Sequence, residues 1–139
     1  MLLDKATLRR LLSWPPGPRR PELAVVLLDA DGDKQRGSGI EQAVDDLPLR
    51  RVIGLAVQEF EAWLISDEKA VAGAIGAPFP TQKAPENMKP REAKTLLLDW
   101  IGRAGADERK ARLTIAATAD LGAIASRCPA FQDFRSKLT

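Results

Sequence analysis

The stretch "LAVVLLDADGDK", residues 23–34, runs an unbroken row of apolar side chains into three aspartates at every second position. Its apolar part, Leu23–Leu28, is short and partly β-branched, which is typical of a strand covered on both faces in an α/β sheet. Asp29, Asp31 and Asp33 begin where this strand ends. Because α/β proteins bind ligands beyond the carboxyl ends of their strands, the stretch predicts a buried strand with a site at its end.

A second buried strand follows after one short helix. The segment "RRVIGLAV", Arg50–Val57, has the same continuous apolar character. Between the two strands lie a polar loop at 34–38 and "GIEQAVDDL", residues 39–47, which predicts a helix. These elements form a βαβ unit, so the two strands should be parallel and their crossover right-handed.

The rest of the chain is predicted to be helical. Helices are expected at 2–13, from Glu59 through "EFEAWLIS", from the Asp67 cap to about Ile75, at 91–104 after Pro90, at 107–118, from the Asp120 cap, and from Pro129 onward. The 139 residues fit a single domain, 1–139, with an α/β part at 1–75 that carries the acids and a helical part at 76–139. The predicted fold class is α/β, with a parallel sheet and a helical C-terminal half.

Apolar spacing predicts which side chains enter the core. The N-terminal helix places its leucines on one side, and the C-terminal helix carries a stripe of Phe131, Phe134 and Leu138. The tryptophans have helical or loop-edge contexts, so we expect core packing rather than stacking on nucleic-acid bases. Cys128 precedes a proline in an apolar stretch and is predicted to be a small buried hydrophobic residue. The leucines are Leu2, Leu3, Leu8, Leu11 and Leu12, and the tryptophans are Trp14, Trp63 and Trp100.

A sheet of only two strands leaves both of its edges without a partner strand, which is unusual for an independently stable fold. We therefore expect something else to cover those edges. The candidates are a second copy of the chain in a homodimer, a different partner protein, or a sheet segment that we expect to be missing from the N-terminus of this chain.

Composition narrows the chemistry and the location. The formal net charge of +2 is too small for a protein that coats nucleic acid through bulk charge, so any such contact must be local. Histidine is absent and Cys128 is the only cysteine, which excludes disulfides, ordinary zinc sites and histidine-dependent catalysis. No stretch reads as a membrane span or a signal peptide, and we expect a cytoplasmic protein.

The three aspartates suit a divalent cation. Side chains two apart on a strand point the same way, so Asp29 and Asp31 converge, and Asp33 joins them if the loop curls back. Two carboxylates about 4 Å apart repel by roughly 4 kcal/mol at an effective dielectric near 20, which favours Mg²⁺ or Mn²⁺ among them. A plain Asp/Gly turn is the alternative. An EF-hand is excluded, because Lys34 and Ile40 occupy the positions of its glycine and glutamate.

The same string resembles haloacid dehalogenase-type phosphatases, which carry D-x-D-G-T after a strand. Asp29, Asp31 and Gly32 match that pattern, whereas Asp33 stands where those enzymes have Thr or Val. Their later acidic pair follows another strand, but the next pair in this chain, "DD" at 45–46, lies beside a helix end. A phosphatase of this type is the less favoured alternative.

Three separated segments together resemble one family. They are "VVLLDADGD" (25–33), "LAVQEFEAWLISD" (55–67) and "ADLGAIASRCPAFQDFRSKL" (119–138), and E-x-E-A-W-L-x-x-D at 59–67 is the most distinctive part. The resemblance is to small, largely uncharacterised bacterial proteins with a Toprim-like fold, relatives of the nuclease domain of overcoming-lysogenization-defect (OLD) nucleases that are often encoded near ATPases. It implies a partial Toprim-like, Rossmann-like domain in a defence or DNA-processing system, in which Asp29 and Asp31 hold Mg²⁺ for cutting or rejoining a phosphodiester.

One part of the Toprim pattern is missing. Toprim domains begin with a strand ending in a glutamate that acts as general acid or base, and we expect that strand and its "EG" to be absent before the first helix. Glu59 or Glu61 is predicted to replace it, because both follow the second strand and open at the same sheet edge as Asp29. Alternatively, both glutamates only favour the helix start through its macrodipole.

Positive charge is the other requirement, since a scissile phosphate must be neutralised beside the metal. Lys34 and Arg36 follow the acids directly. Lys94, with the neighbouring Lys89 and Arg91, lies at the start of a helix that can fold over the site. Lys34, Arg36 and Lys94 are therefore the predicted phosphate contacts.

Two functions follow from these patterns. The first is a Mg²⁺- or Mn²⁺-dependent phosphodiesterase or nuclease acting on nucleic acid, with Asp29, Asp31 and Glu59 as catalytic residues and with Asp29, Asp31, Asp33 and Glu61 around the metal. The second is a catalytically silent Toprim-like subunit that binds a partner such as an ATPase. The missing glutamate favours the second function, and the intact aspartates favour the first.

Overall fold

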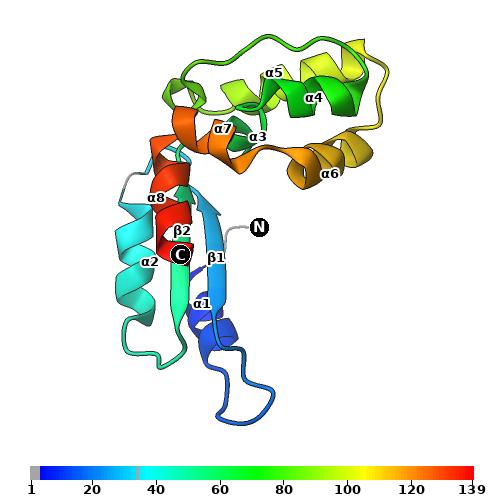
Figure 1. Cartoon of the computed structure of the whole chain (residues 1–139). Coiled ribbons are helices and arrows are strands. Elements are labelled where there is room, and N and C mark those ends of the chain that lie inside the picture. Colours follow the sequence, from blue (N-terminus) through cyan, green and yellow to red (C-terminus); the bar gives the residue numbers. More distant parts are fainter. Residues whose placement is uncertain (1–3, 34) are drawn as a thin grey trace.

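A computed structural model describes residues 4–33 and 35–139 of the chain (Figure 1). It confirms the α/β class, with one parallel sheet and a helical C-terminal half. None of the described helices is long and apolar enough to cross a membrane. The elements are α1 Lys5–Leu12, β1 Ala24–Asp29, α2 Arg36–Val44, β2 Arg51–Ala56, α3 Glu61–Leu64, α4 Glu68–Ile75, the 3₁₀ turn η1 Pro85–Asn87, α5 Glu92–Arg103, α6 Glu108–Thr118, α7 Leu121–Arg127 and α8 Pro129–Leu138.

The sheet consists of β1 and β2, which pair in parallel from Ala24 opposite Arg51 to Asp29 opposite Ala56. Both predicted strands are confirmed. The crossover helix α2 begins earlier than the predicted 39–47, because the Asp33 carboxylate accepts a hydrogen bond from the Gln35 amide (2.9 Å) and starts the helical turn there.

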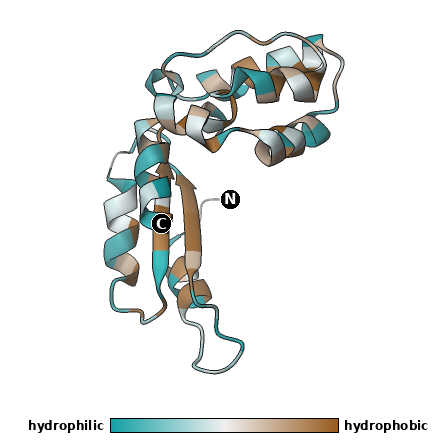
Figure 2. Ribbon diagram, in the orientation of Figure 1, coloured by the Kyte–Doolittle hydropathy of each residue, from teal (hydrophilic) through white to brown (hydrophobic). Residues whose placement is uncertain are grey.

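The two faces of the sheet are covered differently. Helices α1 and α2 pack on one face through a buried cluster of aliphatic side chains from both helices and both strands. Helix α8 packs on the other face, over β2 only, and Phe134 lies against Gly54 (Figure 1). β2 is therefore buried on both faces, whereas β1 leaves Val25 and Leu27 exposed. Figure 2 shows β1 as a largely hydrophobic strand.

Helices α3 to α6 form a layer of their own beyond the carboxyl ends of the strands (Figure 1). Its core consists of aliphatic and aromatic side chains such as Ile65, Val71, Leu97 and Ile115, all fully buried. The packing therefore does not follow the division at residue 75. Helices α3 and α4, from the segment 1–75, pack with α5 and α6, whereas α8, from the segment 76–139, packs on the sheet.

A buried carboxylate joins this helical layer to the sheet. Glu86 accepts hydrogen bonds from the Trp63 indole (2.9 Å) and from the amide of Ala130 (3.0 Å) in the first turn of α8. Trp63 in turn stacks on Phe134, which covers β2. An acceptor at a helix N-terminus satisfies amides that have no partner within the helix, so Glu86 fixes where α8 begins.

Several sequence predictions about caps and core residues are confirmed. The Asp67 and Asp120 side chains cap α4 and α7, Pro129 opens α8, and Cys128 is fully buried. Trp63 lies in the core, and Trp100 packs partly buried against it.

Other core predictions are wrong. Trp14 is 46% exposed, because it lies in the proline-rich loop after α1 and no described element covers it. Leu11 is 56% exposed, because only Leu8 and Leu12 of α1 face the sheet. Leu138 is exposed at the end of α8, beyond the part of that helix that packs on β2. Leu2 and Leu3 lie outside the described residues.

Replacing Gly54 by alanine tests the contact between β2 and α8. An added Cβ would lie 2.5 Å from Phe134 Cδ2, so the ring must move, and we expect a loss of about 1–3 kcal/mol in the free energy of unfolding. Gly73, inside α4, has open space around it, so Gly73→Ala should instead stabilise the chain by about 0.4–1 kcal/mol. Urea denaturation measures both, and equal midpoints for the two variants would contradict this packing.

Candidate functional site

A cavity of about 760 Å³ opens between the carboxyl end of the sheet and the first turns of α5. Four carboxylates line it: Asp29 and Asp31 after β1, and Glu59 and Glu61 after β2. The remaining lining side chains come from α5 and the residue before it, and they are Arg91, Lys94, Thr95 and Leu98. Acids that are up to 32 residues apart in the sequence thus face basic side chains across one cavity.

The parallel register explains why these acids meet. Asp29 lies opposite Ala56, so both strands end at the same level, and the chain after each strand continues at the same edge. Pairing persists past the strands, since the Ala30 amide donates to the Ala56 carbonyl (2.9 Å) and the Asp31 amide donates to the Gln58 carbonyl (3.1 Å). The segment that carries the glutamates is therefore held against the segment that carries the aspartates.

Each aspartate of the cavity is held through one oxygen. Asp29 Oδ1 accepts a hydrogen bond from the Phe60 amide (2.8 Å), and Asp31 Oδ2 accepts one from Arg36 Nη1 (3.0 Å). Arg36 Nη1 also donates to the Asp29 carbonyl oxygen (2.7 Å), so one guanidinium braces both residues. The second carboxylate oxygen of each aspartate accepts no hydrogen bond from the described residues.

The two glutamates are buried and are held in the same way. Glu59 Oε1 accepts a hydrogen bond from the Lys94 amide in the first turn of α5 (2.6 Å), and Glu61 Oε1 accepts two from the guanidinium of Arg112 in α6, one of them at 2.8 Å. Again, the second oxygen of each carboxylate has no hydrogen-bond donor among the described residues. Four acids thus present one uncommitted oxygen each, on side chains that the fold holds in place.

These contacts correct the interpretation that both glutamates begin a helix. Glu59 precedes α3, whose single turn starts at Glu61, and its carboxylate instead caps α5, a helix more than thirty residues further along the chain. The cause is that the backbone after β2 first makes a tight turn, in which the Glu59 amide donates to the Val57 carbonyl (2.9 Å).

Burial and the neighbouring negative charges both oppose the ionisation of Asp29. Burial raises the pKa of Asp29, and the neighbouring charges of Glu61 and Asp31 raise this pKa further. The Phe60 amide and the Arg36 guanidinium act in the opposite direction but do not cancel the effect. The ionised form of Asp29 is therefore short of positive charge, which a bound cation would supply.

Backbone strain gathers at the same place. Among the described residues, the non-glycine residues with positive φ are Asp31 (48°), Gln58 (64°) and Arg91 (66°). Asp31 and Arg91 line the cavity, and Gln58 directly precedes Glu59. The Gln58 Oε1 atom is also buried without a hydrogen-bond partner in the described part of the chain. Such conformations persist where the surrounding structure enforces them, and they are concentrated at functional sites.

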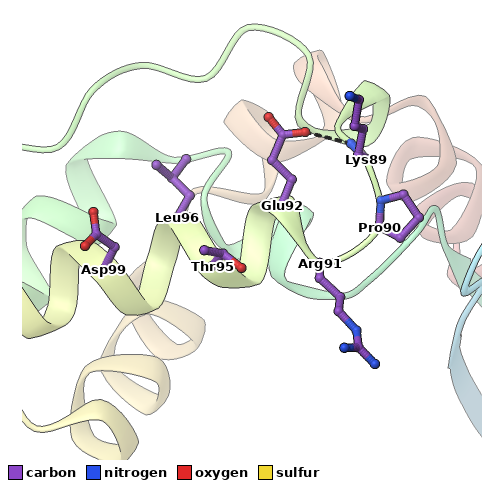
Figure 3. A pocket seen from close by; sticks show the side chains of 7 residues that line it. All are labelled: Lys89, Pro90, Arg91, Glu92, Thr95, Leu96 and Asp99. Carbon is purple, nitrogen blue, oxygen red and sulfur yellow. Dashed lines mark hydrogen bonds between the residues drawn. The ribbon is translucent and has the colours of Figure 1, made fainter.

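A second hollow, of about 650 Å³, adjoins the acidic cavity and shares Arg91 and Thr95 with it. Figure 3 shows the Arg91 guanidinium pointing away from α5, while the Glu92 carboxylate turns back to accept a hydrogen bond from the Lys89 amide (2.8 Å). Arg91 thus stands where the two hollows meet. The other residues around the second hollow are Pro90, Leu96 and Asp99.

Not every predicted site residue reaches the acidic cavity. Asp33 is exposed and is occupied with the start of α2, because the loop turns away after Gly32 instead of curling back. Arg36 braces the aspartates rather than lining the cavity. Lys34 lies outside the described residues. Lys94 does line the cavity, with Arg91 beside it.

Three residues of the site were not predicted: Arg112, Thr95 and Leu98. Arg112 is one basic residue among several on its helix, and nothing near it in the sequence relates it to Glu61, 51 residues earlier. Leu98 lies one turn after Lys94 on the same face of α5, and Thr95 borders that face. Both could be predicted as site residues only once that face was known to point at the acids.

The donor set has the chemistry of a Mg²⁺ or Mn²⁺ site, since both ions prefer carboxylate oxygens. The carboxylates are not drawn together, however, because within 4–33 and 35–139 no three acids, cysteines or histidines are grouped closely enough to hold a metal ion among themselves. An ion at this edge would therefore have to take one or two carboxylates and complete its shell with water and substrate oxygens, as Mg²⁺ commonly does.

The sole cysteine takes no part in this site. Burial raises the pKa of the Cys128 thiol to about 11, although a hydrogen bond with the Ser66 hydroxyl (2.9 Å) acts against that shift. At neutral pH the thiol is therefore protonated and enclosed, which excludes it as a nucleophile.

Comparison with known proteins gives one relationship. No curated protein and no solved structure matches the chain. Residues 5–139 match the family described as a domain of unknown function, DUF4276, so the match covers both strands and all four acids of the cavity. The chain therefore belongs to the DUF4276 family.

Proposed function

We propose that this protein is a Mg²⁺- or Mn²⁺-dependent phosphodiesterase of the Toprim-like type that acts on nucleic acid. The observation that carries the proposal is the set of four carboxylates, each held through one oxygen and facing Arg91 and Lys94 across one cavity. A cation needs the free oxygens, and a phosphodiester needs both the cation and the basic side chains.

In this proposal the aspartates hold the ion. Asp29 and Asp31 come from one strand end, and burial together with the neighbouring acids opposes the ionisation of Asp29. A Mg²⁺ or Mn²⁺ ion held there would polarise a phosphoryl oxygen and make its bound water more acidic. Glu61 adds negative charge beside Asp29, and the free oxygen of Glu59 serves to accept a proton from the attacking water.

The basic residues then orient the substrate. Arg91 and Lys94 lie opposite the acids, where their charges neutralise a phosphate that approaches the ion. Arg36 and Arg112 act as positioning residues, since each holds one acid in place and leaves its second oxygen open. Arg36 thus takes a role different from the phosphate contact expected from its position in the sequence.

A second candidate is a catalytically silent subunit that binds a partner such as an ATPase. One observation favours it: Glu59 and Glu61 are both committed to internal contacts, as cap of α5 and as partner of Arg112. Acids kept only for such structural roles would bind no cation. Cation binding and cleavage of single- and double-stranded DNA and RNA therefore separate the two candidates.

Asp29→Asn should weaken cation binding without unfolding the chain. The amide oxygen can still accept the Phe60 hydrogen bond, but the anionic ligand is gone, so we expect Mn²⁺ affinity to fall by about tenfold or more in calorimetric titration. The melting temperature of the metal-free protein should rise, because the variant removes a carboxylate whose ionisation burial opposes. Asp45→Asn, an exposed acid after α2, is the matched control and should change neither quantity. Equal Mn²⁺ affinity in the parent and in Asp29→Asn would refute the metal site.

The raised pKa of Asp29 predicts a specific pH dependence. In the metal-free protein, the ¹³C shift of its carboxyl carbon should titrate with a midpoint above the ordinary value of 3.8, and Glu61→Gln should lower that midpoint. Because the folded state binds this proton more tightly than the unfolded chain does, Asp29 favours folding less as the pH rises through its raised pKa. Mn²⁺ affinity should fall as the pH is lowered through the same midpoint. A midpoint at or below 3.8 would contradict this description of the cavity.

Arg91→Gln should weaken substrate binding and leave the cation site intact. Loss of a charged hydrogen bond to phosphate costs about 1.5–3 kcal/mol, so we expect KM for a nucleic-acid substrate to rise by roughly 10- to 100-fold. Mn²⁺ affinity should be unchanged. Arg103→Gln, at the other end of α5 and paired with Asp99, is the control and should behave like the parent. A similar KM for both variants would show that Arg91 does not contact the substrate phosphate.

A further inference from the structure

The outer edge of β1 has unused backbone hydrogen-bonding groups. The amides of Ala24 and Ala30 donate toward β2, so the even-numbered residues between them face β2 and the odd-numbered ones face outward. Val25 and Leu27 therefore point their N–H and C=O groups away from the sheet. No strand in 4–33 or 35–139 pairs with that edge.

The side chains of the same two residues are apolar and uncovered. Val25 is 51% exposed and Leu27 is 41% exposed, on the face where α8 covers only β2. Trp14, in the loop between α1 and β1, is exposed as well. An open strand edge and an apolar surface thus coincide on one strand, a combination that soluble proteins usually avoid.

We propose that a second copy of this chain occupies this edge, through antiparallel pairing of β1 with β1 of the copy. In the register that we infer, Val25 of each copy lies opposite Leu27 of the other. The two copies then share one four-stranded sheet, in the order β2, β1, β1, β2. Each two-fold-related pair exchanges two backbone hydrogen bonds and places one exposed apolar side chain against another.

Charge favours a copy in this orientation. Arg19 and Arg20 precede β1, and the acidic residues Asp31 and Asp33 follow it. Antiparallel pairing brings the arginines of one copy beside the acids of the other, whereas parallel pairing would place like charges together. The loop before β1 projects beyond the lower end of the sheet, and the helical layer extends sideways above its upper end (Figure 1). The loop of one copy thus arrives beneath the helical layer of the other, next to the acidic cavity.

The register follows from the side chains. A slip by two residues in one direction would place the Asp29 carboxylate opposite Val25, in the apolar pair. A slip in the other direction would place Pro21, which has no N–H, in the hydrogen-bonded row. Pairing Val25 with Leu27 avoids both defects and lies entirely within β1.

The dimer is tested first by mass, independently of any activity. Light scattering on the purified chain should give twice the monomer mass of 15.1 kDa. Leu27→Lys places a charge in the apolar pair and should give the monomer mass with an unchanged circular dichroism spectrum. Leu113→Lys replaces a 63% exposed leucine on α6, away from the sheet, and should remain dimeric. A monomeric parent, or a Leu27→Lys variant that is still dimeric, would overturn the proposal.

Cysteine cross-linking tests the register. Directly opposed residues of a hydrogen-bonded antiparallel pair have Cα atoms about 5.5 Å apart, within disulfide range, whereas diagonal neighbours lie about 7–8 Å apart. An oxidised mixture of Val25→Cys and Leu27→Cys chains should therefore form a mixed covalent dimer, and either variant alone should not. The parent, whose single Cys128 is fully buried, provides the background. A dimer that does not cross-link in the mixture would disprove this pairing.

Discussion

The hydrogen bond from the Phe60 amide to Asp29 Oδ1 (2.8 Å) ties the last residue of β1 to the chain that leaves β2. The parallel register alone brings both strand ends to one edge, but it does not fix the direction of the segments that follow them. This bond fixes the turn that carries Glu59 and Glu61, and Glu59 then caps α5. The position of the helical layer over the sheet edge therefore depends on a carboxylate that is also the best candidate ligand.

All four acids of the cavity have two roles, one in the fold and one in the site. One oxygen of each carboxylate accepts a hydrogen bond that holds the fold, and the same side chain lines the cavity. The arrangement costs stability, because burial and neighbouring acids oppose the ionisation of Asp29. Proteins commonly retain such destabilising groups where function needs them. The positive φ angles of Asp31, Gln58 and Arg91 also indicate a functional site, because this backbone strain is confined to the edge that carries the acids.

The elements that follow from local patterns were predictable. Continuous apolar runs gave the two strands, and single residues such as Asp67, Asp120 and Pro129 marked the helix starts, because each acts on amides only a few positions away. The meeting of Asp29 with Glu59 was also predictable, since it follows from parallel strands ending at one edge.

Features that depend on distant partners were not predictable. Arg112 binds Glu61 only because α6 packs beside α3, and no spacing in the sequence encodes that contact. Asp33 is a different case, because it was expected at the site and a local hydrogen bond from the Gln35 amide (2.9 Å) instead holds it at the start of α2. Trp14 was expected in the core, yet it lies in the loop after α1, where no described element covers it. Tertiary packing thus decides the places of Arg112 and Trp14, whereas at Asp33 two locally acceptable loop conformations compete.

The two strands differ in a way that links the edge of the sheet to the site. β2 is enclosed by α8 on one face and by the α1 and α2 layer on the other, so little can displace it. β1 has one covered face, one bare face and one open edge, and it ends in Asp29. A strand with one bare face frays more readily than a strand that is covered on both faces. A copy that pairs with β1 as we propose would therefore steady Asp29 and its contact with Phe60, and by linkage a cation bound at Asp29 would favour that pairing by the same free energy.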